Sequence, residues 1–72
     1  MTTYVLSQNP NTWTINRHSD GVSPLATGIS SEEDALAIAL ANAKKDTPSQ
    51  IVRITLTGDS RVIATFDIDF EN

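Results

Sequence analysis

The sequence lacks cysteine altogether, and its 72 residues include only one tryptophan, one tyrosine and two phenylalanines. Without cysteine, disulfides, zinc–thiolate sites, iron–sulfur clusters and thiol catalysis are excluded. No stretch approaches the roughly 20 apolar residues of a membrane-spanning helix, and no charged segment followed by an apolar one opens the chain as a secretory signal would. We therefore expect a soluble, cytoplasmic protein that does not bind a membrane.

Positive charge is also scarce. Five Lys and Arg residues stand against nine Asp and Glu, which gives a net charge of -4, the wrong sign for sequence-independent binding to a phosphate backbone. Nucleic-acid binding is therefore the alternative hypothesis rather than the leading one. It would use the basic residues Arg17, Lys44, Lys45, Arg53 and Arg61.

The length allows one small domain over residues 1–72, since domains usually run to about 100 residues or more. Hydrophobic residues make up 39% of the chain and charged residues 19%. This balance is typical of a globular chain and not of a disordered one.

The N-terminal part predicts a β-hairpin of residues 3–7 and 12–18, with turn residues between them. Pairing Leu6 with Trp13, and Tyr4 with Ile15, places four large apolar side chains on one face.

A turn at residues 19–21 leads to residues 22–27. These form a third strand with Pro24 at an edge, or else residues 17–30 form a long irregular loop.

The segment between Ser30 and Pro48 predicts an amphipathic helix. Ser30 or Ser31 can cap its N-terminus, with Glu33 or Asp34 three residues later, and a proline after the last turn ends it. The apolar stripe predicts that one side packs on a sheet; it consists of Leu36, Ala39, Leu40 and Ala43, broadened by Ala35 and Ile38.

Residues 51–57 and 61–70 alternate between apolar and polar side chains and predict a second hairpin. A three-residue loop, 58–60, pairs Leu56 with Val62, Ile54 with Ala64 and Val52 with Phe66. The side chains expected to face inward are Val52, Ile54, Leu56, Val62, Ala64, Phe66, Ile68 and Phe70. The predicted fold class is α+β, in the order ββ(β)αββ, with a mainly antiparallel sheet and one helix packed on one face.

No group of residues predicts catalysis, a metal site or a cofactor. His18 is the single histidine, and Ser19 and Asp20 follow it directly. Adjacent residues of a strand point to opposite faces, so these three do not assemble a nucleophile, base and acid. We expect a protein that is not an enzyme.

The outward face of the second hairpin is the candidate protein-binding surface. Its isoleucines, with a charged rim, have the composition of a partner surface, and they equally suit ordinary solvent exposure. The residues assigned to this surface are Ile51, Arg53, Thr55, Ile63, Asp67 and Asp69.

The run at residues 25–36, LATGISSEEDAL, resembles the passage from strand to helix in HicB-type antitoxins, where a G-x-T-x-E-E-A-like run opens the helix. The resemblance implies a protein that neutralises a small basic RNase by direct contact. Many of those antitoxins add a DNA-binding tail, and no helix-turn-helix or ribbon-helix-helix pattern is present in these 72 residues. Trp13-Thr14-Ile15, the alanine-rich helix and the final hairpin also resemble small bacterial and phage domains of unknown function with strand-strand-strand-helix-strand architecture.

We therefore expect a small acidic protein-interaction module, such as an antitoxin-like or phage-type inhibitor. Its partner would be a basic protein, held at the sheet face or at an unpaired strand edge. A homodimer formed through a strand edge is compatible with this hypothesis.

Overall fold

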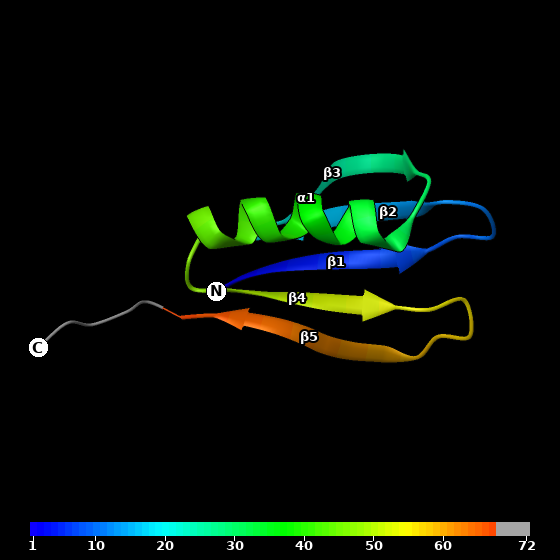
Figure 1. The fold of residues 1–72 in the computed structure, drawn as a ribbon. Helices are drawn as coiled ribbons and strands as arrows, with labels where there is room; N and C mark the ends of the chain where they lie inside the picture. The colour runs from blue at the N-terminus through cyan, green and yellow to red at the C-terminus, as the bar shows by residue number, and fades with distance from the viewer. Residues whose placement is uncertain (68–72) are drawn as a thin grey trace, which may run out of the picture.

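The computed structural model describes residues 1–67, which form one five-stranded sheet with a helix across one face (Figure 1). The elements in chain order are β1 (Thr2–Gln8), β2 (Trp13–His18), β3 (Val22–Ile29), α1 (Glu32–Lys45), β4 (Ser49–Ile54) and β5 (Ser60–Phe66). The predicted α+β class and order of elements are confirmed, and the optional third strand forms.

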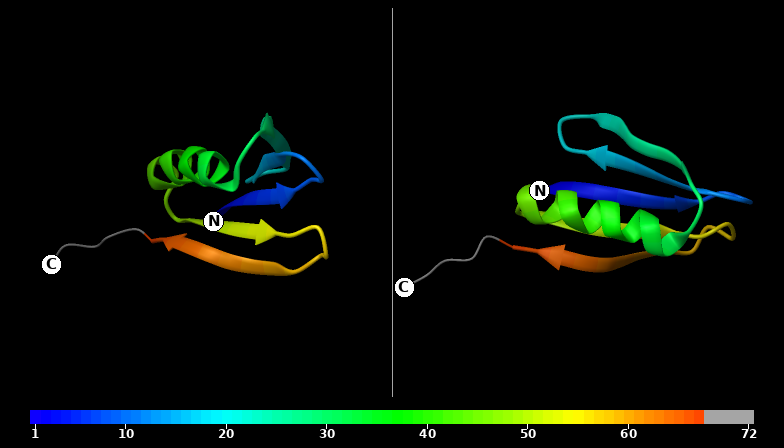
Figure 2. Two further views of the ribbon diagram at one scale, coloured as in Figure 1. Left: turned by 45° about the vertical axis from the view of Figure 1, so that its right-hand side comes forward. Right: turned by 45° about the horizontal axis from the view of Figure 1, so that its top comes forward.

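The strand order is β3-β2-β1-β4-β5, so the first strand of the chain lies at the centre of the sheet. Three of the four neighbouring pairs are antiparallel, and β1 with β4 is the parallel pair. The helix connects β3 at one edge to β4 on the other side of β1. The views in Figures 1 and 2 show the helix on one face of the sheet, with the other face uncovered.

The core lies between the helix and the sheet. Four large side chains from β1 and β2 and one from β4 meet three small side chains from the helix. The helical residues Ala35, Ala39 and Ala43 recur every four positions, so a ridge of methyl groups faces the strands and lets the helix approach closely. The buried hydrophobic residues are Tyr4, Leu6, Trp13, Ile15, Ala35, Ala39, Ala43 and Ile51.

The predicted apolar stripe of the helix is confirmed except at one position. Leu36 and Leu40 pack partly against the core, whereas Ile38 is exposed. Ile38 lies about 100° around the helix from Ala39, on the flank of the alanine ridge, and 36% of its surface is exposed there.

The two ends of the helix are fixed by local chemistry. The Ser31 hydroxyl accepts a hydrogen bond from the Asp34 backbone N–H at 3.1 Å, which makes Ser31 the N-cap. Asp46 is the C-cap, and its backbone N–H donates to the Ala43 carbonyl. Acidic residues fill the first turn and lysines the last, as the helix dipole favours.

In the first hairpin the apolar side chains lie on one face as predicted, but the two strands pair in a different register. Leu6 lies opposite Ile15, Tyr4 opposite Arg17 and Gln8 opposite Trp13. The predicted pairs are therefore wrong by two residues. Because side chains alternate with a period of two, that slip leaves all the apolar side chains on the core face.

The inward face of β4 was predicted wrongly. Ser49 and Ile51 are fully buried under the helix, so Val52 and Ile54 point to the opposite face, and Leu56 is exposed in the following loop. The cause is the short connection after the helix. It brings Ser49 beneath the last turn, where its hydroxyl donates to the Ala43 carbonyl at 2.6 Å, and this contact sets the side-chain alternation along β4.

The second hairpin also departs from its predicted register. Its loop has five residues, 55–59, in place of three, and the strands pair Ile54 with Ser60 and Ile51 with Ala64. A bulge follows, because Val52 pairs with Val62 and leaves Ile63 as the extra residue. Ala64 and Phe66 pack against the core as predicted.

The bulge turns Val62 outward, with 56% of its surface exposed, so its predicted inward position is wrong. Ile68 and Phe70 lie outside the described residues.

Candidate functional site

The predicted protein-binding surface does not form as a unit. Ile51 is fully buried beneath the helix, and Arg53, two residues on, shares that face. The Arg53 Nε lies 2.8 Å from a carboxylate oxygen of Glu32, and its guanidinium carbon lies 5.9 Å from the centre of the Trp13 ring. The assignment of Ile51 and Arg53 to an outward surface is therefore wrong, since both face the layer between sheet and helix.

The other predicted residues of that surface are scattered. Thr55 lies in the β4–β5 loop, where its hydroxyl accepts a hydrogen bond from the Asp59 backbone N–H at 3.2 Å. Ile63 remains 41% exposed at the bulge. Asp67 is exposed just after β5, and Asp69 lies outside the described residues.

A different apolar group lies on the uncovered face of the sheet. Val5 is the cross-strand partner of Val52, and Val52 is the partner of Val62, so three valines form a line across β1, β4 and β5. We call these three residues the valine row. They face away from the helix because Val5 alternates with the buried Tyr4 and Leu6 of its strand.

Two isoleucines extend the valine row. Ile54 lies two residues beyond Val52 on the same face, and Ile63 is the extra residue of the bulge beside Val62. Together with these isoleucines, the row forms an apolar strip across three strands.

Uncharged polar side chains surround the apolar strip. Gln50 and Thr3 are cross-strand partners, and their side chains form a hydrogen bond of 3.1 Å. An apolar centre with a polar rim is the anatomy of a protein interface. The remaining polar side chains of this face, by strand alternation and cross-strand pairing, are Ser7, Thr14, Asn16, His18, Ser60 and Thr65.

Both edges of the sheet carry features that oppose pairing with a further strand. On β3, Pro24 lacks a backbone N–H, and the pairing of β3 with β2 shifts register twice. On β5, the bulge at Ile63 interrupts the regular ladder. Prolines and bulges at edges are devices that natural sheets use against edge-to-edge association. The uncovered face is therefore a better candidate for a binding surface than either edge.

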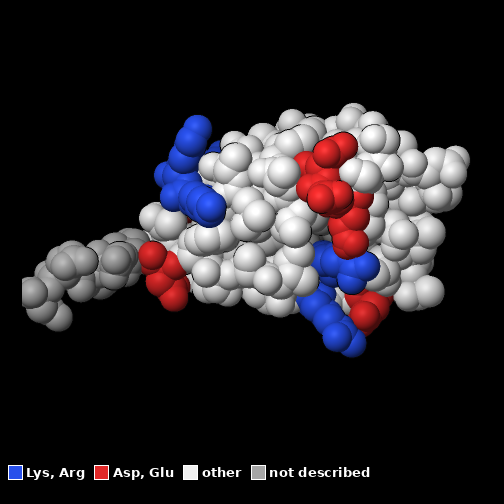
Figure 3. All heavy atoms as spheres, viewed as in Figure 1, with Lys and Arg blue, Asp and Glu red and all other residues white. Residues whose placement is uncertain are grey.

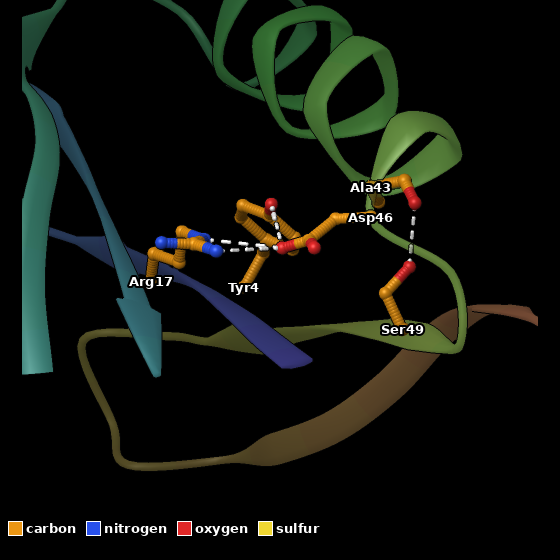
Figure 4. Close-up of polar contacts among 5 residues, drawn as sticks. All are labelled: Tyr4, Arg17, Ala43, Asp46 and Ser49. Carbon is orange, nitrogen blue, oxygen red and sulfur yellow. Dashed lines mark hydrogen bonds and ion pairs between the residues drawn. The ribbon is translucent and has the colours of Figure 1, made fainter. Parts of the chain in front are cut away.

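The second polar feature is a three-residue cluster at the end of the helix (Figure 4). The Tyr4 hydroxyl donates to the Asp46 Oδ2 atom at 2.9 Å, and the Arg17 Nε and Nη2 atoms reach the same oxygen at 3.1 and 3.0 Å. We call these residues the Tyr4–Arg17–Asp46 cluster. Its hydrogen bonds link β1 and β2 to Asp46, the residue that ends the helix.

The cluster shifts the pKa of each member. Hydrogen bonds from Tyr4 and Arg17 hold the pKa of the Asp46 carboxyl below its ordinary value of 3.8. Burial, followed by the hydrogen bond to Asp46, raises the pKa of the Tyr4 phenol above 10.0. The hydrogen bond to Asp46 raises the pKa of Arg17 as well. All three shifts favour a neutral phenol between a carboxylate and a guanidinium.

A hollow of about 360 Å³ lies beside this cluster. Its walls come from β1, β2, β3 and the last turn of the helix, and its lining residues are Tyr4, Arg17, Leu25, Asn42, Lys45 and Asp46. A second hollow of about 340 Å³ lies at the β2–β3 turn, lined by Arg17 and residues 19–23. Residues 19–23 are all exposed, so this second hollow has no buried wall. In the hollow beside the cluster, Tyr4 provides one.

The basic residues of the nucleic-acid alternative do not gather on one surface. Arg53 and Arg61 are cross-strand partners, and Arg53 reaches Glu32 at the start of the helix. Lys44 and Lys45 close the 14-residue helix, about 20 Å away at 1.5 Å per residue.

Figure 3 shows two separate basic groups in this view, with uncharged surface between them and acidic side chains near each. Arg17, Arg53 and Arg61 are each in an ion pair, with Asp46, Glu32 and Asp59 respectively. This arrangement gives no continuous basic stripe for a phosphate backbone.

Within residues 1–67, no cluster of three or more His, Asp or Glu side chains is arranged to hold a metal ion. In the same part of the chain, no helix is long and apolar enough to cross a membrane. Comparisons with protein-family models, with curated proteins and with solved structures find no match.

Sequence reasoning missed both the valine row and the Tyr4–Arg17–Asp46 cluster. The valine row was hidden because the alternation of β4 was assigned to the wrong face. The cluster carries no local signal, since 42 positions separate Tyr4 from Asp46.

Proposed function

We propose that this chain is a non-enzymatic protein-interaction module whose uncovered sheet face takes a protein partner. The observation that carries the proposal is the valine row, in which Val5, Val52 and Val62 lie in register across three strands on a face without a helix. A two-layer domain normally buries the apolar side of its sheet, and this sheet has apolar side chains on both sides.

The charge of the chain favours a basic partner. With a net charge of -4, the protein attracts a cationic protein over distances of about a Debye length, 8–10 Å in physiological salt. The valine row itself is uncharged, so apolar contact would supply the short-range part of the binding. An inhibitor that covers a surface of a basic enzyme, as the resemblance to HicB-type antitoxins implies, is the specific form of this proposal.

The test compares two valine-to-glutamate variants that differ in where the new charge lies. Val62→Glu places it in the valine row, whereas Val22→Glu places it on edge strand β3, at a position 65% exposed and separated from the row by β2. The wild-type protein, immobilised, is used to capture a partner from a lysate of the source cells. The purified partner is then titrated into all three proteins by calorimetry.

We expect Val62→Glu to weaken binding at least tenfold, because it buries a carboxylate in an apolar contact, and Val22→Glu to change it less than twofold. Circular dichroism confirms that both variants are folded. Equal binding by wild-type protein and Val62→Glu, or no retained partner at about 50 mM salt, would overturn the proposal.

A further inference from the structure

The hollow beside the Tyr4–Arg17–Asp46 cluster combines three features of a ligand site. It is a shallow, open hollow of about 360 Å³, at the lower end of the roughly 300–1,000 Å³ that small-molecule sites occupy. Its polar groups converge from elements that are far apart in sequence. All three residues whose pKa is shifted line it, and perturbed groups in a concave site mark functional candidates.

The local charge is opposite in sign to that of the whole chain. Arg17 and Lys45 line the hollow together with one carboxylate, that of Asp46, and Lys44 is the neighbour of Lys45 in sequence. The three charged residues that line the hollow, Arg17, Lys45 and Asp46, sum to +1, which exceeds the roughly -0.5 charge of a helix C-terminus. In a protein of net charge -4, this is a positive site.

Donor groups remain available there. Arg17 directs Nε and Nη2 at a single oxygen of Asp46, and among residues 1–67 no hydrogen bond or ion pair engages its Nη1 atom or the Lys45 ammonium. Both side chains reach solvent, with 42% of the Arg17 side chain exposed. A planar guanidinium and a nearby ammonium are the groups that proteins use to hold carboxylate and phosphate oxygens.

We propose that this hollow is a binding site for a small oxyanion, a carboxylate or a phosphate group. The Arg17 Nη1 and Lys45 Nζ atoms are the donors that bind it, and Leu25 forms an apolar wall at its side. The proposal is independent of the valine row, which lies on the opposite face of the sheet.

The experiment titrates sodium phosphate and, separately, sodium acetate into ¹⁵N-labelled full-length protein at constant ionic strength, with sodium chloride as the reference. The matched variants are Lys45→Gln and Lys44→Gln. Both remove one exposed charge from the last helical turn, and only Lys45 lines the hollow.

We expect saturable amide shifts at Arg17, Leu25 and Lys45, with a dissociation constant on the order of millimolar. Lys45→Gln should weaken the binding about threefold, the effect of removing one solvent-exposed charge pair, and Lys44→Gln less than twofold. Saturation in the phosphate or the acetate titration identifies which oxyanion the site takes. Shifts that grow linearly and match those of chloride, or equal effects of the two variants, would overturn the proposal.

Discussion

The Tyr4 hydroxyl donates a hydrogen bond of 2.9 Å to Asp46, and this contact closes a loop of 42 sequence positions. Tyr4 lies on the central strand and is only 2% exposed, whereas Asp46 is the residue that ends the helix. Arg17 reaches the same carboxylate oxygen from β2. The end of the helix is thereby held over the middle of the sheet.

Tyr4→Phe removes the buried hydroxyl and keeps the ring. We expect the free energy of unfolding to fall by about 1.5 kcal/mol, the usual worth of a hydrogen bond to a charged group. Asp46 stays paired with Arg17, so the variant leaves no buried charge without a partner. Urea unfolding of both proteins at pH 7 measures the change, and a loss below about 0.3 kcal/mol would contradict it.

The depressed pKa of Asp46 predicts a stability that depends on pH at the acid end. The folded protein binds the proton of this carboxyl less tightly than the unfolded chain does. The stabilisation is therefore fully present above about pH 5 and is lost as the pH falls below the ordinary value of 3.8 and through the pKa of folded Asp46. Unfolding midpoints between pH 7 and pH 2 should show a smaller acid loss for Asp46→Asn than for wild-type protein. If the midpoints of Asp46→Asn and wild-type protein fall in parallel as the pH is lowered, Asp46 is not the source of the acid loss.

The same cluster predicts a loss of stability in alkali. Because the pKa of Tyr4 is raised above 10.0, the fold favours the neutral phenol. The stabilisation that this phenol contributes is therefore fully present below about pH 10 and is lost as the pH rises through the pKa of folded Tyr4. Tyr4→Phe should flatten this part of the curve, whether followed by fluorescence or by circular dichroism.

The alanine ridge of the helix sets the distance between helix and sheet. Ala39 is fully buried in the core, whereas Ala37, two positions earlier, is exposed. Ala39→Leu adds three heavy atoms to a packed layer and should cost about 1–3 kcal/mol of unfolding free energy. Ala37→Leu adds the same atoms in solvent and should change stability by less than about 0.5 kcal/mol. Similar losses in the two variants would show that the ridge does not set the packing.

The two serines before the helix provide a test of the cap. Ser31 accepts the hydrogen bond from Asp34, while Ser30 is exposed and lies outside the cap position. Ser31→Ala should lower the free energy of unfolding by about 1 kcal/mol, and Ser30→Ala should leave it nearly unchanged. A larger loss of unfolding free energy for Ser30→Ala than for Ser31→Ala, measured by urea unfolding, would show that Ser30 is the cap.

Local chemistry made most of the fold predictable. The caps, the turn residues and the apolar alternation each depend on a few neighbouring residues, and the helix and four of the five strands follow from them. The third strand, β3, was left open between a strand and a loop. The core face of the first hairpin was also predictable despite its wrong register, because a slip of two residues preserves the face of Leu6 and Ile15.

The face of β4 depends on a contact that its own sequence does not contain. Both sets of alternate residues in that strand include apolar side chains, so alternation alone does not decide between Ile51 and Val52. The helix determines which set is buried, because the Ala43 carbonyl in its last turn accepts a hydrogen bond from the Ser49 hydroxyl. The candidate surface was misassigned for the same reason, since a shift of one residue exchanges the buried and the uncovered faces.

The parallel pairing of β1 with β4 has a consequence for how the chain folds. Thr2 and Ser49 are partners, so the middle of the sheet closes only when segments 47 positions apart meet. Contacts of such separation slow folding, because the entropy of closing the intervening loop is lost before the contacts form. During synthesis, the β1–β2 hairpin would emerge early, with the side of β1 that later binds β4 still open. Assembly of the core then waits for the helix and β4 to leave the ribosome.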